Sequence, residues 1–319
     1  MEIKQTKTRT KEKLLSNGKL KEQLAMQSMI LPGLILVIIF AYIPLFGLII
    51  AFKDYNLYSG IFGSPWVGLK HFKEFFGDRN FLLIMRNTIA ISFLKLIFCF
   101  PAPIALAVLL NEIANMRNRR IIQTVTYMPY FISWVVVSGM IITLLSADGG
   151  TVNWLLTKMG VVDEPVNFLS NPDYFWTILI ASNVWKSIGY NAIIYLAAIS
   201  GISPDLYEAA SLDGASRFRQ IFAITLPSIA TQIVIMLIMN VANILNAGFD
   251  DILLLTNNGE NSILMSVADV IDTYVYRVGI KSQRFSFATA VGVFKSVVNI
   301  SMLLLANKIT KKIGEISLW

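Results

Sequence analysis

The chain contains six apolar runs, each about as long as a helix must be to cross a lipid bilayer. A spanning helix needs roughly 20 apolar residues, and lipid excludes segments that leave backbone polar groups unpaired. The chain is 319 residues long, 55% apolar and only 15% charged, which is typical of a membrane protein. The expected fold class is therefore all-α, a polytopic bundle of six transmembrane helices. The runs are Ser28–Phe52, Leu83–Leu110, Ile121–Leu145, Tyr174–Ser200, Pro227–Ala247 and Phe285–Asn307.

Charge placement orients this bundle. With the N-terminus inside, the cytoplasmic segments carry fifteen Lys and Arg residues and the outer segments carry eight. This is the bias of the positive-inside rule, so we expect both termini to be cytoplasmic. The domains are then a basic arm (1–27), a transmembrane domain (28–307) and a cytoplasmic tail (308–319). The placement of the basic residues explains the net charge of +7, so this charge does not indicate a protein that binds nucleic acid. The arm either serves orientation with attraction to anionic membrane lipid or contacts a specific partner.

The sequence lacks the residue clusters that catalysis, metal binding or nucleotide binding would need. Cys99 is the only cysteine and His71 the only histidine, so the chain has no disulfide and no Cys- or His-cluster metal site. It also lacks the G-x-x-x-x-G-K-[ST] phosphate loop. We therefore expect no catalytic residue, no metal and no cofactor in this chain, which is not an enzyme.

A short motif lies between the fourth and fifth runs, on the predicted cytoplasmic side. It consists of Glu208-Ala209-Ala210, three further residues, Gly214, nine residues and then Ile224-Thr225-Leu226-Pro227. Ser203, Pro204 and Asp205 are typical of a helix start, and Gly214 is typical of a helix end. With a second short helix over 216–224, segment 203–226 is predicted to form a helical hairpin. The hairpin either docks on a partner or lies at the membrane surface without one.

The motif resembles the EAA loop of the permease subunits of bacterial ATP-binding-cassette (ABC) importers. The resemblance extends over about 28–307 to the maltose-permease-like carbohydrate family, in its polysaccharide and oligosaccharide branch (alginate-type or similar). It rests also on Tyr42-Ile43-Pro44, Asn183-Val184-Trp185 and Leu253-Leu254-Leu255-Thr256. One departure is Asn257-Asn258-Gly259-Glu260, where the family usually has Gly-Gly-Pro.

This resemblance implies an assembly in the bacterial cytoplasmic membrane. The partners would be a second, similar permease, two ATPase subunits that bind ATP and Mg, an extracytoplasmic solute-binding protein and an oligosaccharide. The hairpin would dock on an ATPase through the Glu-Ala-Ala motif and the end of its first helix. ATP-driven closure of the two ATPases would then open the bundle outward. The implied coupling residues are Glu208, Ala209, Ala210, Asp213 and Gly214.

The same resemblance places a solute path on the runs around the hairpin. The fourth run contributes Asn183, Trp185, Lys186 and Tyr190, and the fifth contributes Asn243 and Asn246. Aromatic rings stack on sugar faces and amides bind hydroxyls, so these residue types suit a sugar. The alternative for the asparagines is hydrogen bonding between helices. A further outer segment, 250–284, is expected to form an amphipathic helix that packs on the bundle or helps to form an outer gate.

Four basic residues lie inside the runs, which contain no Asp or Glu: Arg86, Lys95, Lys186 and Lys295. Intramembrane charges usually face a cavity or a partner. We expect these bases to lack an acidic partner in this chain and to meet an anionic, uronate-containing solute, and Lys295 joins the predicted solute path. The alternatives are carboxylates on the second permease or, for Arg86, snorkelling to the membrane surface.

Two other functional classes fit less well. A stand-alone secondary transporter or channel would leave the hairpin idle, and ion-coupled transporters generally need an intramembrane acidic residue. A membrane-embedded enzyme needs a cluster of reactive groups, which one histidine outside the runs does not provide.

Overall fold

The computed structural model describes residues 26–314, and these divide into two compact units, 26–68 and 69–314. The predicted basic arm falls outside the described residues except for 26 and 27, as does the end of the predicted tail, 315–319. Within the described part of the chain all regular structure is helical, and the β-type pairing is one isolated bridge.

The first unit is a helix followed by a small lobe. Met26–Phe52 forms one membrane-length helix, which changes from α to π and 3-10 geometry around Pro44 because proline removes a backbone donor. Its elements are η1 (Ile38–Tyr42), α2 (Ile43–Leu45), η2 (Phe46–Phe52) and α3 (Gly60–Gly63). Phe52 stacks on Trp66, with ring centroids 5.7 Å apart, and Lys53 bonds the Ile61 carbonyl at 2.7 Å, so the lobe is closed on itself.

The second unit holds all remaining helices. In chain order they are α4 (Lys70–Phe76), α5 (Phe81–Phe98), α6 (Pro101–Asn111), α7 (Met116–Tyr127), η3 (Met128–Phe131), α8 (Trp134–Leu145), α9 (Thr151–Lys158), α10 (Pro172–Ser200), α11 (Pro204–Leu212), α12 (Arg217–Gln220), η4 (Ile221–Thr225), α13 (Leu226–Ser228), α14 (Ala230–Ala242), α15 (Asp250–Leu255), α16 (Met265–Ala268), α17 (Ile271–Val275), η5 (Tyr276–Lys281) and α18 (Phe285–Gly314).

The described residues contain three helices long and apolar enough to cross a membrane, or five if each of two bent pairs counts as one span. The three are Met26–Phe52, Phe81–Asn111 and Phe285–Lys312. The predicted third run is bent by 99° between Phe131 and Trp134, and the predicted fifth is bent by 62° next to Ile229. Helix α10, the predicted fourth span, has 29 residues but is not among these candidates. Six spans and cytoplasmic termini therefore stay a prediction.

The fifth and sixth runs end at different residues from those predicted. Helix α14 ends at Ala242 instead of continuing to Ala247, because three asparagines follow one another closely there and their amides bond nearby carbonyls. The last helix continues through Gly314, into the predicted tail. The predicted amphipathic helix in 250–284 is divided into α16, α17 and η5.

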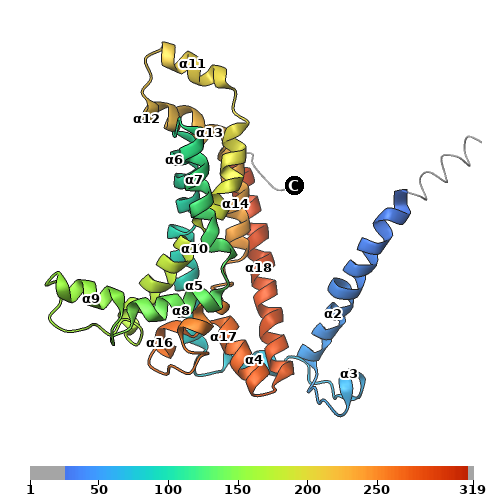
Figure 1. Ribbon diagram of the computed structural model, residues 1–319. Coiled ribbons are helices and arrows are strands. Elements are labelled where there is room, and N and C mark those ends of the chain that lie inside the picture. Colours follow the sequence, from blue (N-terminus) through green and yellow to red (C-terminus); the bar gives the residue numbers. More distant parts are fainter. Residues whose placement is uncertain (1–25, 315–319) are drawn as a thin grey trace, which may run out of the picture. The chain divides into compact units, whose positions relative to one another are not determined.

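Helix α10 is the centre of the second unit. Its first half contributes Phe175 and Leu179 to a core shared with α5, α15 and α16. Its second half contributes Ala192, Leu196 and neighbours to a core shared with α6 and α14. A third core joins α4, α5, α17 and α18. Figure 1 shows α11 and α12 at one end of this unit and α4, α16 and α17 at the other end.

Gly189 lets α10 approach the first half of the bent run. A Cβ at this position would lie 2.1 Å from the carbonyl oxygen of Thr126 and 2.9 Å from the Tyr127 ring. The obstacle at Thr126 is backbone, which cannot move aside like the end of a side chain. A glycine is therefore required at this crossing, while Gly139 in α8 has open space around it.

Carboxylates from the segment after α14 bind basic side chains of the bundle. Asp251 accepts from Lys95 at 2.7 Å and from the Asn183 amide at 2.9 Å, and its side chain is only 5% exposed. Asp272 pairs with Lys295 of α18, whereas Asp269 pairs with Arg277 of η5, within the same segment. This segment is thereby tied to α5, α10 and α18.

A tyrosine hydroxyl also binds this segment to the residues before α5. Tyr274 in α17 donates to Asp78 at 2.6 Å. Its burial, together with this hydrogen bond, raises its pKa above the ordinary value, so the phenol keeps its proton.

Replacing Gly189 by alanine should destabilise the protein. Overpacking a tight contact costs about 1–3 kcal/mol, so the thermal midpoint in detergent should fall. The matched Gly139→Ala should be neutral or stabilise by about 0.5–1 kcal/mol, because glycine is a poor interior helix residue. Equal midpoints for the two variants would contradict the close crossing.

Removing the Asp251 carboxylate should destabilise the protein more than Gly189→Ala does. Breaking a buried ion pair from one side typically costs about 3–5 kcal/mol, because the remaining charge has no partner. Asp251→Ala should therefore lower the thermal midpoint strongly, and Lys95→Met with Asp251→Leu should recover most of the loss. The control Asp163→Ala, at an exposed position, should stay within about 0.5 kcal/mol of the parent. A double variant no more stable than Asp251→Ala would show that the ion pair is not the cause.

Candidate functional site

The hairpin over 203–226 begins as its sequence predicts. The Ser203 hydroxyl accepts from the Asp205 amide at 3.3 Å, and Pro204 occupies the first turn of α11. Ser216 caps α12 in the same way, by accepting from the Arg219 amide. Both helices therefore start at a side-chain cap that the local sequence encodes.

The turn between α11 and α12 depends on Gly214. Its φ is +76°, the left-handed region that glycine favours. The Ala215 amide then returns to the Ala210 carbonyl at 2.9 Å, which closes the end of α11. Gln220, which is buried, bonds the Ser211 hydroxyl and the Ala215 carbonyl, and so ties the second helix to the first.

The hairpin presents its motif to the outside. Glu208, Ala209, Asp213 and Gly214 are exposed and Ala210 is half-buried. Leu212, at the end of α11, is 90% exposed. The hairpin is also anchored at its base, because the Tyr207 hydroxyl lies 3.0 Å from that of Thr225. It is therefore a closed unit with small, charged and apolar groups available to a partner.

Lys186 and Tyr190 meet at the break of the third run. The Lys186 ammonium donates to the carbonyls of Pro129 at 3.2 Å, Tyr130 at 2.8 Å and Ile132 at 2.5 Å. The Tyr190 ring lies parallel to that of Tyr130, with centroids 3.7 Å apart. Both rings are partly exposed, so this place offers aromatic surface to a solute.

Asn183 and Trp185, also on α10, lie away from this break and differ in their contacts. Asn183 bonds the Leu179 carbonyl and the Asp251 carboxylate and is half-buried. Trp185 is 45% exposed and lines two largely apolar cavities, one of about 430 Å³ between α10 and α8 and one of about 740 Å³ between α10 and α5. Trp185 is thus open to contact, while Asn183 is engaged within the chain.

The remaining predicted path residues form two further places. The Asn246 amide donates to the Asn243 side chain at 2.7 Å, and both residues are exposed just beyond the end of α14. Lys295 binds Asp272 on α17. The predicted path residues are therefore distributed over several clusters in this subunit.

The expectation that the intramembrane bases lack an acidic partner in this chain is wrong for Lys95 and Lys295. Their partners, Asp251 and Asp272, lie outside the apolar runs but fold back against them. Arg86 bonds its neighbour Asn87 and the Ser266 carbonyl, and Lys186 is bound by carbonyls. All four side chains therefore have hydrogen-bond partners within this chain, and those of Lys95 and Lys295 are carboxylates.

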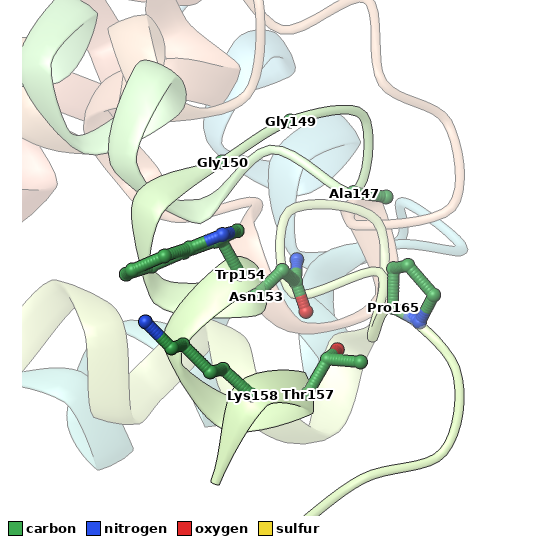
Figure 2. Close-up of a pocket in the computed structure, with 8 residues that line it drawn as sticks. All are labelled: Ala147, Gly149, Gly150, Asn153, Trp154, Thr157, Lys158 and Pro165. Carbon is green, nitrogen blue, oxygen red and sulfur yellow. The ribbon is translucent and has the colours of Figure 1, made fainter.

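A cavity of about 410 Å³ lies beside α9, on the segment predicted to be outside (Figure 2). The buried Asn153 holds its walls together, because its amide bonds the carbonyls of Ser146 and Val166 and accepts from the Val166 amide. Lys158 lies over the exposed Trp154 ring, 4.7 Å from its centroid. No sequence prediction covered this place, although Gly149-Gly150 followed by Trp154 and Lys158 was its local signal.

Sequence reasoning also missed Tyr130, Phe131 and Trp134 at the break. The local signals were present, since Pro129 disfavours a continuous helix and Ser133 is a good helix start. The Ser133 hydroxyl does cap α8, by accepting from the Val136 amide. The run of 121–145 contains no charged residue, however, and so also fits one straight span.

A protein-family model supports the resemblance. Residues 99–315 match the family described as "Binding-protein-dependent transport system inner membrane component", and this range includes the hairpin and α10.

Similar proteins point the same way. The chain is 44% identical to the polygalacturonan/rhamnogalacturonan transport system permease protein YteP of Bacillus subtilis, over 93% of this chain and 91% of that protein. It is 42% identical to protein LplB of the same organism, over 90% and 88%.

Solved structures agree in fold. A chain from a bacterial ABC transporter involved in the import of the acidic polysaccharide alginate matches with a TM-score of 0.84 and 40% identity, over 93% of this chain and 98% of that one. A second match, with a TM-score of 0.84 and 39% identity, comes from a bacterial alginate ABC transporter in complex with an alginate pentasaccharide-bound periplasmic protein. The chain therefore belongs to the binding-protein-dependent permeases of ABC transporters, in the carbohydrate branch to which its motifs pointed.

Proposed function

We propose that this chain is one of two permease subunits of an ATP-driven importer for acidic, uronate-containing oligosaccharides. It forms the translocation path with a second, similar permease and receives energy from two ATPase subunits. An extracytoplasmic binding protein delivers the solute. The assembly lies in a bacterial cytoplasmic membrane, and ATP and Mg are bound by the ATPases.

The observation that carries this proposal is the geometry of the hairpin. A coupler must move as one body, and α11 and α12 are tied together by Gln220 and anchored by Tyr207. The exposed small residue Ala209 lets a partner helix or groove approach the backbone, and Glu208 offers a charge to a Lys or Arg across the contact. Asp213, Gly214 and the half-buried Ala210 shape the end of the same surface.

The proposed solute class rests on the relatives, because the intramembrane bases no longer argue for it. Two of the matched proteins are named for the transport of polygalacturonan and rhamnogalacturonan or of alginate, and all three polymers contain uronic acids. The chain adds a suitable aromatic surface, since Trp185 and Tyr190 are partly exposed and aromatic faces stack on sugar rings. Asn243 and Asn246 offer exposed amides for hydroxyl groups.

Alternating access follows from this arrangement. ATP closes the ATPase dimer and brings the hairpins of the two permeases together. The helices attached to each hairpin, α10 and α14, then move with it, since both pack in the core nearest to the hairpin. The path opens toward the binding protein and accepts the oligosaccharide.

The ATPase activity of the complete reconstituted complex tests the proposal. With its binding protein present, oligogalacturonides should stimulate hydrolysis severalfold, and a neutral oligosaccharide of equal length should not, because the path and the binding protein are matched to uronic acids. The control is the same complex without binding protein.

The outcomes separate the two parts of the proposal. Stimulation by the neutral sugar alone would keep the importer and discard the acidic solute. Stimulation by neither sugar, across a panel that includes alginate and rhamnogalacturonan fragments, would refute the carbohydrate importer itself.

A further inference from the structure

The break of the third run leaves backbone carbonyls without helical partners. Helix η3 ends at Phe131 and α8 starts at Trp134, with a bend of 99° between the two halves. The last carbonyls of any helix lack amide donors, and unpaired backbone groups are costly in a membrane. The Ile132 amide donates to the Pro129 carbonyl. The carbonyls of Tyr130 and Ile132 receive their donor from another helix.

That donor is Lys186 of α10. Its ammonium has three N–H groups, and it lies within hydrogen-bond distance of three carbonyls, those of Pro129, Tyr130 and Ile132. The residue is only 8% exposed. A cation is also favourable at the C-terminal end of a helix. With its donors used and its head buried, Lys186 has no free N–H to offer to a solute carboxylate.

The same contact sets the position of an aromatic surface. Tyr130, whose carbonyl Lys186 holds, stacks on Tyr190 with an interplanar angle of 4°. Phe131 meets both rings edge-on, with centroids 5.7 Å from Tyr130 and 6.3 Å from Tyr190. Phe131 is 76% exposed and the two tyrosines about half as much. We name these three residues the aromatic shelf.

Lys186 and Tyr190 lie one helical turn apart on α10, so the helix holds both partners of Tyr130. Lys186 fixes the Tyr130 backbone and Tyr190 supports its ring. Gly189 removes the side chain that would separate α10 from this part of the bent run. The shelf is therefore a product of the break, and the break is closed by one buried ammonium.

We propose that Lys186 is a positioning residue for solute transfer, which acts through Tyr130 and does not touch the solute. It holds the backbone of the break so that the shelf stays in place to support a sugar ring. This inference rests on the proposed function, since it takes an oligosaccharide as the solute. It assigns the role of Lys186 to the backbone of this chain instead of to a carboxylate of the solute.

A double-mutant cycle between Lys186 and Tyr130 tests the inference. The measurement is uptake of an oligogalacturonide trimer by the complete complex in proteoliposomes, per ATP hydrolysed and at saturating binding protein. Lys186→Met and Tyr130→Ala should each lower this ratio about two- to tenfold, the range expected for losing an aromatic contact. Because both act on the same shelf, the double variant should be no worse than the poorer single variant.

Conservative variants and a control accompany the cycle. Lys186→Arg and Tyr130→Phe should keep most of the ratio, because the first retains a cationic donor and the second retains the ring. Lys308→Met, at an exposed position on α18, should leave it unchanged. If Lys186→Met does not assemble, Lys186→Gln keeps two donors without the charge and completes the cycle.

Multiplying effects in the double variant would overturn the inference, since independent action is what a direct Lys186–solute contact predicts. Unchanged uptake per ATP in Lys186→Met would overturn it as well. If the parent complex takes up a neutral oligosaccharide instead, the acidic-solute proposal fails and the cycle is run with that sugar. A complex that takes up no saccharide contradicts both.

Discussion

A cation held largely away from water must be neutralised or hydrogen-bonded, and three lysines of the second unit meet that requirement within the chain. Lys95 does so through Asp251, Lys295 through Asp272 and Lys186 through the carbonyls of a broken helix. Each solution joins segments far apart in sequence. The apolar cores supply most of the burial, but apolar contacts are not directional. The charged contacts therefore specify which segments lie against α10, α5 and α18.

The two ends of the second unit differ in how they are held together. The hairpin helices α11 and α12 lie at one end (Figure 1). The hairpin is closed by its own hydrogen bonds, and its motif residues are exposed. At the other, the segment after α14 is bound to the bundle by its carboxylates. Helix α10 connects them, since it packs in the core near the hairpin, anchors Asp251 through Asn183 and closes the break through Lys186. In the proposed mechanism, a movement of the hairpin would therefore reach the aromatic shelf through one continuous helix.

The sequence predicted what depends on neighbouring residues. Ser203 and Gly214 act within one or two turns, so the hairpin could be derived from spacing and confirmed by geometry. The partners of the intramembrane bases could not, because Lys95 and Asp251 are 156 residues apart and only the tertiary fold brings them together. The break at Pro129 lies between these cases. Its signals are local, but an apolar run of 25 residues also fits one straight helix.

The most direct test of the account is the accessibility of position 212 in the assembled transporter. In a Cys99→Ser background, a cysteine replacing the exposed Leu212 is treated with a membrane-impermeant maleimide, with a cysteine at Thr157 as the outer reference. Intact cells should label position 157 only. Position 212 should react in inverted vesicles stripped of ATPase subunits and become protected when those subunits are added back. Labelling of position 212 in intact cells, or equal labelling with and without the ATPase, would contradict a cytoplasmic coupling hairpin.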